Sequence, residues 1–283
     1  RRDIHLPSVR DKAFAIVGMR RAGKTTYMHQ LRADRLAAGS RPEQLVYFNF
    51  EDERLGEFEA RQLALIPDTH ARLFPDLEHQ GIAFYFHEIQ RVPGWELFVR
   101  RLLDMRGNNV FLSGSSAKLL SREIATSMRG RAWELDIFPF SFREYRRHYG
   151  LETPEGPNRL TRRQALRLDS QWADYLAQGG FPEAQSLNAT DRRQWLQNYV
   201  DVVLLRDIIE RHNISNSTAL RWMVRRLLGS PAGLFSVSKL FADLKSQGIA
   251  AGRETLFELL DTSRMPSSCT RWRSPRTPKS NDR

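Results

Sequence analysis

The sequence has almost no cysteine and no long apolar run. Cys269 is the single cysteine among 283 residues, which excludes a disulfide framework and a cysteine-based zinc site. No apolar run approaches the roughly 18 residues that would suggest a membrane span. The first residues contain neither an initiator Met nor the apolar core of a signal peptide. We therefore expect a cytoplasmic protein that makes no membrane contact and whose extreme N-terminus is missing.

The net charge of +11 is unevenly distributed. Such an excess ordinarily favours nucleic acid or another anionic surface as a partner. Residues 262–283 hold six Lys or Arg and one Asp, so this short tail supplies +5 of the total. Residues 1–261 are only moderately basic, and their charge alone does not predict DNA binding.

Residues 18–25 read Gly-Met-Arg-Arg-Ala-Gly-Lys-Thr and match the phosphate-loop pattern G-x-x-x-x-G-K-[ST] at every defined position. An apolar run at 13–17 predicts a strand before the loop, and residues 25–38 predict a helix after it. In that context the backbone N–H groups of the loop curl around the β- and γ-phosphates of a nucleotide, and the helix N-terminus adds its positive dipole end. The alternative is a Gly-rich turn that happens to precede a helix. The predicted nucleotide contacts are Gly18, Arg21, Ala22, Gly23, Lys24, Thr25 and Thr26.

Two of these side chains have specific predicted roles. Lys24 would reach the β- and γ-phosphate oxygens of ATP, and the Thr25 hydroxyl would hold Mg²⁺. Both ligands, ATP and Mg²⁺, are therefore predicted from this loop.

Further apolar runs at 45–50, 82–86, 110–112 and 133–138 alternate with helical segments. This alternation is typical of a three-layer α/β domain with a mostly parallel sheet. We predict that residues 1–149 form a P-loop nucleotide-binding domain of this class.

The pattern changes after this domain. Residues 150–163 contain Gly, two Pro, Asn and several charges, and predict a linker. Residues 164–261 are predicted to be all-helical, with helices at 165–178, 190–212, 217–228, 236–246 and 253–261. The last two resemble a helix-turn-helix pair. Residues after Arg253 are mostly apolar or acidic, which favours a packing role over reading DNA.

The segment Phe-Tyr-Phe-His-Glu at 84–88 ends an apolar strand with an acidic residue. P-loop ATPases use acidic residues at this point to manage Mg²⁺ and the attacking water. Glu88 is well placed to orient the attacking water. His87, however, occupies the position at which an Asp is expected to organise the metal ion. Mg²⁺ prefers oxygen ligands in octahedral geometry, so an imidazole is a poor replacement. We predict His87 at the metal site, with nucleotide binding retained and hydrolysis slow; a core histidine is the alternative.

Two later segments complete the predicted catalytic set. Ser-Gly-Ser-Ser at 113–116 follows a strand, and either Ser115 or Ser113 would lie beside the γ-phosphate. In Met-Arg-Gly-Arg at 128–131, Arg129 and Arg131 would reach the phosphate of a neighbouring subunit and stabilise charge in the transition state. That role predicts a homo-oligomer; solvated surface arginines are the alternative.

These motifs fall in one order along the chain. The chain thereby resembles bacterial and archaeal AAA+-type ATPases that carry a restriction-endonuclease-like domain at the C-terminus. The resemblance implies a winged-helix lid over the nucleotide and places Pro182 beside it. The family reads Asp-Glu-Ile-Gln, so His87 is a departure. The matching segments are 18–25, 51–52, 87–90, 92–96, 113–116, 129–131, 138–142, 179–183 and 206–208.

Three functions remain open at this stage. The first is an ATP-binding AAA+-like protein that hydrolyses ATP with Mg²⁺. The second is a DNA-binding regulator switched by nucleotide, and the third is an inactive truncated remnant. Salt-dependent binding of duplex DNA would favour the second.

Residues 262–283 lack periodicity and are rich in Arg, Ser and Pro, which usually indicates disorder. A frame change explains them better. The single Met codon ends in G and Pro codons begin CC, so a one-base shift at Met265-Pro266 encodes Ala. The same one-base shift along the rest of this segment gives a peptide that is apolar and strand-like after its first few residues. We expect an out-of-frame tail without function, standing where the nuclease-like domain would begin; the coding DNA tests this directly.

Overall fold

The computed structural model describes most of the chain and divides it into two compact units, residues 1–198 and 199–283. The predicted boundary at residue 149 does not coincide with this division. The described residues are 1–9, 11–77, 80–105, 107–114, 128, 130–151, 160–202, 209, 216–229, 236–249, 252, 254, 256–257 and 260.

The first unit contains a five-stranded sheet in the order β2-β3-β4-β1-β5, in which every pairing is parallel. All five strands coincide with predicted apolar runs to within about two residues. The strands are β1 (Ala13–Gly18), β2 (Leu45–Asn49), β3 (Ala83–His87), β4 (Asn109–Ser113) and β5 (Ala132–Ile137).

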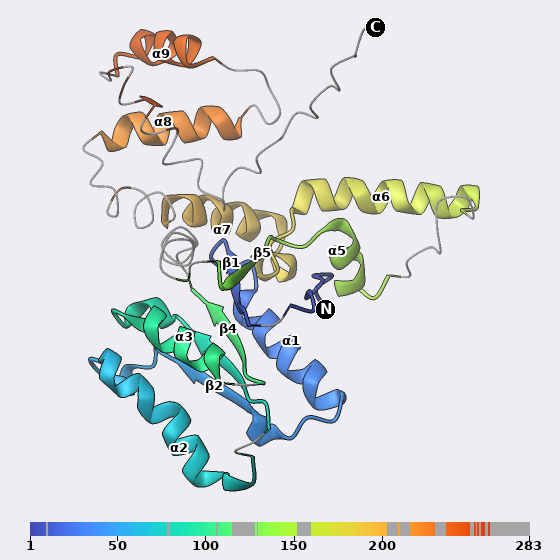
Figure 1. Ribbon diagram of the computed structural model, residues 1–283. Coiled ribbons are helices and arrows are strands. Elements are labelled where there is room, and N and C mark those ends of the chain that lie inside the picture. The colour runs from blue at the N-terminus through green and yellow to red at the C-terminus, as the bar shows by residue number, and fades with distance from the viewer. Residues whose placement is uncertain are drawn as a thin grey trace, which may run out of the picture. The chain divides into compact units, whose positions relative to one another are not determined.

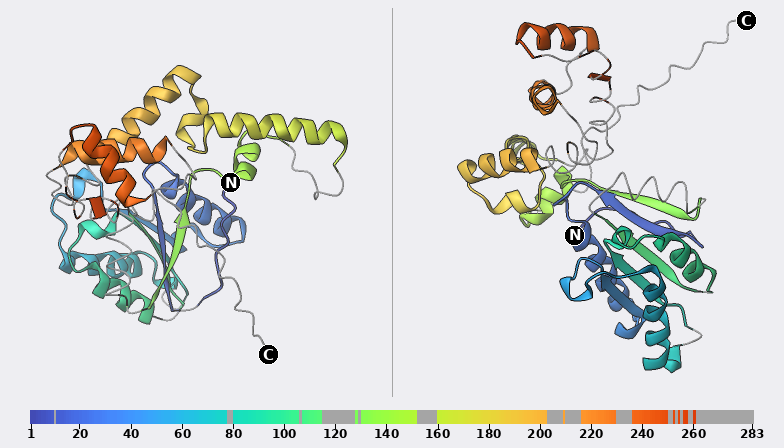
Figure 2. Two further views of the ribbon diagram at one scale, coloured as in Figure 1. Left: turned by 90° about the horizontal axis from the view of Figure 1, so that it is seen from above. Right: turned by 90° about the vertical axis from the view of Figure 1, so that its left-hand side faces the viewer.

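Helices cover both faces of this sheet (Figures 1 and 2). Alternate residues along β1, β2, β3 and β4 enter two separate apolar cores, as expected for a parallel sheet buried on both sides. The edge strand β5 has exposed residues at Trp133, Glu134 and Asp136. One core includes Trp95 and Phe98, and the other includes Tyr27 and Met28. The predicted three-layer α/β fold is confirmed. The helices of the layers are α1 (Lys24–Ala37), α2 (Leu65–Leu73) and α3 (Trp95–Asp104).

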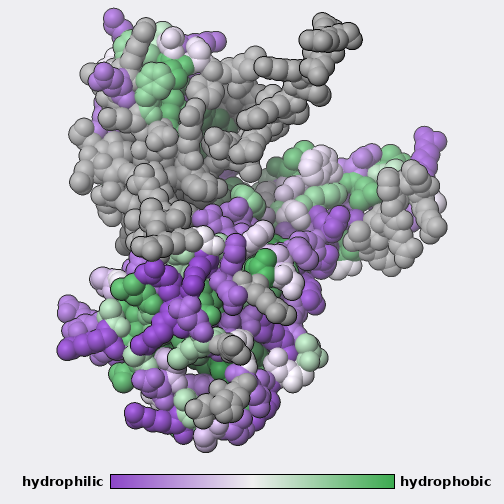
Figure 3. Space-filling view, in the orientation of Figure 1, coloured by the Kyte–Doolittle hydropathy of each residue, from purple (hydrophilic) through white to green (hydrophobic). Residues whose placement is uncertain are grey.

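The end of the sheet leads into α5 (Phe142–His148), α6 (Arg162–Gln178) and α7 (Ala189–Val202). Aromatic rings join α5 to α6: Phe142 lies 5.0 Å from Trp172, and Tyr145 lies 5.2 Å from Tyr175, measured between ring centroids. These contacts explain why α6 belongs to the first compact unit. Along α6, Leu166 and Leu176 remain exposed, and Figure 3 shows hydrophobic surface on this helix.

The second unit is helical in its described part. It contains α8 (Ser217–Leu228) and α9 (Val237–Ser246), which match two predicted helices closely. Apolar side chains of both helices share a core with Leu256 and Leu260. The predicted helix at 253–261 lies mostly outside the described residues, so the winged-helix lid stays a prediction. Among the residues that the structure describes, no helix is both long and apolar enough to cross a lipid bilayer.

Candidate functional site

The loop between β1 and α1 has the backbone curl that phosphate binding requires. Gly18 has φ 147° and Gly23 has φ 97°, both in the left-handed region that favours glycine. A Cβ on Gly18 would lie 2.2 Å from the Ile137 carbonyl oxygen of β5. Gly18 is therefore required both by its φ angle and by the close approach of two strands.

Lys24 begins α1 and is almost fully buried. Its Nζ donates hydrogen bonds to the carbonyl oxygens of Gly18 at 3.0 Å and Met19 at 2.8 Å. These bonds hold the ammonium group against the loop, where its charge attracts phosphate.

Arg2 in the N-terminal segment donates a hydrogen bond to the phosphate loop, a contact that the sequence motifs did not predict. The guanidinium of Arg2 donates to the carbonyl oxygens of Ala22 and Phe138, and to Glu144 Oε2 at 3.4 Å. It also lies over the Phe140 ring. Arg2 and Glu144 are 7% and 6% exposed, so this ion pair is buried, and burial lowers the pKa of Arg2.

Replacing Arg2 by Met is expected to lower the free energy of unfolding by about 3 kcal/mol, because it leaves a buried carboxylate without its cation. Urea denaturation measures this change. Arg1→Met is the matched control: Arg1 pairs with Asp34 at 2.8 Å, but both side chains are exposed, so its loss costs less than about 1 kcal/mol. Equal losses in the two variants would contradict a structural role for Arg2.

A cavity of about 450 Å³ lies over the loop. It brings together most of the predicted nucleotide and metal residues from distant parts of the sequence. Gly18 and Ala22 do not line it; Ala22 is fully buried beneath the loop. The lining residues are Arg20, Arg21, Gly23, Lys24, Thr25, Thr26, Glu51, His87, Glu88, Pro182 and Glu183.

Pro182 lines this cavity, as the family resemblance implied, and Glu183 adds a contact that the sequence analysis missed. The Arg21 guanidinium lies 3.1 Å from a Glu183 carboxylate oxygen. The turn that carries Pro182 and Glu183 is held against the segment after β5, because the Phe140 amide donates a hydrogen bond to the Gly180 carbonyl oxygen at 2.6 Å.

His87 is the last residue of β3, paired with Asn49 of β2 and Ser113 of β4. Its Nδ1 lies 2.7 Å from the Ser113 hydroxyl oxygen, and its Nε2 lies 3.9 Å from a Glu51 carboxylate oxygen. Burial lowers the pKa of His87, partly offset by the negative charges of Glu88 and Glu51. The imidazole is therefore largely neutral at pH 7, and it faces the cavity instead of the apolar core.

Glu88 follows in the left-handed region, with φ 57° and ψ 36°. For a residue other than glycine this conformation costs about 1 kcal/mol or more and is common at functional sites. Glu88 is 4% exposed, and its Oε2 accepts a hydrogen bond from Gln90 Nε2 at 2.5 Å. A Cβ on Gly114 would lie 2.6 Å from Gln90 Oε1. Gln90 thus positions Glu88, and Gly114 leaves room for Gln90.

The remaining predicted catalytic residues are in different places. Ser115 and Arg129 lie outside the described residues. Ser113 is fully buried and contacts His87. Arg131 is absent from the lining of the nucleotide cavity and pairs instead with Asp104 of α3 at 2.5 Å.

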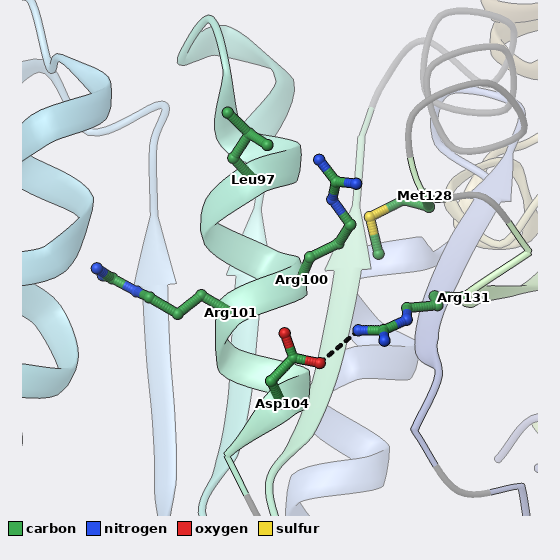
Figure 4. Close-up of a pocket in the computed structure, with 6 residues that line it drawn as sticks. All are labelled: Leu97, Arg100, Arg101, Asp104, Met128 and Arg131. Carbon is green, nitrogen blue, oxygen red and sulfur yellow. Dashed lines mark hydrogen bonds and ion pairs between the residues drawn. The ribbon is translucent and has the colours of Figure 1, made fainter.

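The Arg131–Asp104 pair lines a second cavity of about 370 Å³ (Figure 4). In that view the two side chains point toward each other, whereas Arg101 points away. Leu97, Arg100, Arg101 and Met128 complete the lining. Within this chain Arg131 forms an ion pair with Asp104 of α3. Its predicted action on the nucleotide of a neighbouring subunit stays a prediction.

Two of the three arginines of α8 have acidic partners, which bears on the predicted DNA partner. Arg221 lies 2.6 Å from Asp201, and Arg226 lies 3.5 Å from Asp243. Both charges are therefore offset by acidic neighbours within the second unit.

Comparison with known protein families gives two matches. Residues 10–146 match the family described as an AAA domain, and residues 169–283 match a domain of unknown function, DUF8612. The second match extends over the segment at 262–283.

Curated relatives align with most of the length of this chain. The chain is 32% identical to MJ1544 of Methanocaldococcus jannaschii over 92% of its own length and 56% of that protein. It is 27% identical to a Haemophilus influenzae protein over 87% and 58% of the two lengths. The chain thus spans little more than half of these relatives. Among solved structures, the Aeropyrum pernix ORC1 protein in complex with DNA aligns over 89% of this chain and 77% of that chain, with 12% identity and a TM-score of 0.32.

Proposed function

We propose that this protein, which carries an AAA-type P-loop domain at residues 10–146, binds ATP in the cavity over its phosphate loop. The observation that carries the proposal is the placement of Lys24. Its ammonium lies against a loop whose two glycines have positive φ angles, at the N-terminus of α1. Loop N–H groups, the helix dipole and Lys24 all attract the same phosphate oxygens.

The rest of the cavity suits a triphosphate. Thr25 and Thr26 add hydroxyl groups to its lining, and Arg20 and Arg21 add positive charge. Glu88 also lines this cavity, and its carboxylate is buried and held by Gln90. In this position its carboxylate orients a water molecule toward the terminal phosphate. The proposed activity is therefore ATP hydrolysis.

The residues at the metal position do not suit Mg²⁺. The Thr25 hydroxyl and the Glu51 and Glu88 carboxylates offer oxygen, but His87 presents an imidazole where a carboxylate oxygen is expected. Since Mg²⁺ demands near-octahedral oxygen coordination, we propose that ATP binds while hydrolysis supported by Mg²⁺ is slow.

Two further parts of the proposal concern assembly and the lid. Arg129 and Arg131 are proposed to act on the nucleotide of a neighbouring copy in a homo-oligomer. Residues 236–261 are proposed to form the winged-helix part of a lid.

ATP and ADP are expected to raise the melting temperature by about 4–7 °C at a concentration near 100 times Kd, where binding stabilises the folded state by about 2.7 kcal/mol. AMP should give no shift, because it lacks the β-phosphate that Lys24 contacts. A thermal-denaturation assay with the three nucleotides measures this. Equal protection by AMP, or no protection by any of the three, would overturn the proposal.

A further inference from the structure

We propose that Glu51, His87 and Glu88 bind a divalent first-row transition-metal ion, represented by Zn²⁺, in preference to Mg²⁺. The inference rests on the proposed function for the ion's role beside the phosphates of ATP. The ligand set itself consists of protein side chains and is testable without nucleotide.

The three side chains converge closely enough to share one ion. Each offers a ligand atom, and these atoms all lie within 4.8 Å of one another. A shared zinc ion needs ligand distances of about 2.0–2.2 Å. Glu51 is half exposed, with 52% of its side chain accessible, so its carboxylate has room to rotate toward His87.

Neighbouring residues already orient the two inner ligands. The Ser113 hydroxyl lies 2.7 Å from His87 Nδ1, and Nε2 is the nitrogen on the side of Glu51. Metal-binding histidines ordinarily use their second ring nitrogen in this way. Gln90 holds one oxygen of Glu88. Both supporting residues come from outside the ligand set.

The carboxylate of Glu51, the most exposed of the three ligands, is also directed toward His87. Arg91 lies 3.8 Å from Glu51 Oε1, whereas Oε2 is the oxygen nearer to His87 Nε2, at 3.9 Å. The arginine therefore contacts one carboxylate oxygen and leaves the other on the imidazole side.

The donor types select the metal. One imidazole nitrogen with two carboxylate oxygens suits zinc, cobalt and related ions, whereas Mg²⁺ prefers oxygen ligands alone. Three protein ligands leave at least one coordination position open. All three residues line the cavity that also contains Lys24 and Thr25, so a phosphate oxygen or water can occupy the open position.

The test uses the tag-free, chelator-treated 283-residue chain in a Cys269→Ser background, which removes its single thiol. Titration with Co²⁺ is expected to give visible absorption bands with a stoichiometry of one ion per chain. Stoichiometric Zn²⁺ should abolish these bands, whereas about a 100-fold excess of Mg²⁺ should leave them.

Variants assign the ligands. His87→Asp and Glu51→Gln are each expected to weaken Co²⁺ and Zn²⁺ binding about tenfold or more. His5→Asp is the matched control, because it removes an exposed histidine in the same way and should bind both ions as the parent does. Glu51 is half exposed, so its variant folds even if His87→Asp does not, and circular dichroism checks both.

Unchanged zinc affinity in His87→Asp and Glu51→Gln, or displacement of Co²⁺ by Mg²⁺, would overturn the inference. Nucleotide protection measured on the same samples separates the two proposals. Protection by ATP without Co²⁺ bands overturns the metal assignment alone. Co²⁺ bands without protection by ATP overturn the proposed function and leave the ligand set standing.

Discussion

Replacing Lys24 by Ala is expected to weaken ATP binding about 100-fold, because two charge-assisted hydrogen bonds to phosphate contribute about 3 kcal/mol together. Lys24 is the lysine that lines the cavity, and its ammonium lies against the loop carbonyl oxygens. Equilibrium titration with a fluorescent ATP analogue measures the affinity directly.

Lys12→Ala is the control for this experiment. Lys12 immediately precedes β1 and its ammonium lies over the Trp133 ring, 5.7 Å from the centroid; it does not line the cavity. Its variant should bind the analogue as tightly as the parent. If Lys24→Ala also binds with parental affinity while remaining folded, the phosphate loop does not hold ATP.

Replacing His87 by Asp is expected to raise the turnover of ATP with Mg²⁺ about tenfold or more, with little change in nucleotide affinity. The substitution supplies a carboxylate oxygen at the end of β3, where Mg²⁺ coordination requires one. Steady-state phosphate release measures the turnover, and the fluorescent titration measures the affinity.

Adding Glu88→Gln to His87→Asp should remove the gained turnover, because the amide does not accept a proton from water. His29→Asp adds the same carboxylate outside the cavity lining and should leave turnover at the parental rate. If the parent already turns over as fast as His87→Asp, then His87 does not limit hydrolysis.

The sheet was predictable because its inner strands β1, β3 and β4 are buried on both faces and appear in the sequence as apolar runs. The edge strand β5 instead alternates apolar and charged residues. The phosphate loop was predictable for a related reason. Gly18 and Gly23 both have positive φ angles, and such local backbone geometry is encoded by the spacing of glycines in the sequence.

Contacts between distant segments were not predictable from spacing. Arg2 meets Glu144 across half of the chain. Glu144 belongs to the capping box of α5, but no sequence motif links it to Arg2. Contacts of this kind also extend the first compact unit past the predicted boundary at residue 149. Gly, Pro and charges at 150–163 indicate a break, yet Trp172 and Tyr175 pack on α5 and keep α6 with the sheet.

The predicted helix at 190–212 is confirmed over its first part, where α7 spans Ala189–Val202. Residues 203–208 and 210–215 lie outside the described part of the chain, so the end of this helix stays a prediction.

The pairing at the end of β3 has an evolutionary consequence. Residue 87 is paired through its backbone with Asn49 on one side and Ser113 on the other, so its location does not depend on its side chain. His and Asp codons differ only in their first base. A single point mutation therefore exchanges nitrogen for oxygen at an unmoved position, and the metals supplied by a habitat would select between the two alleles.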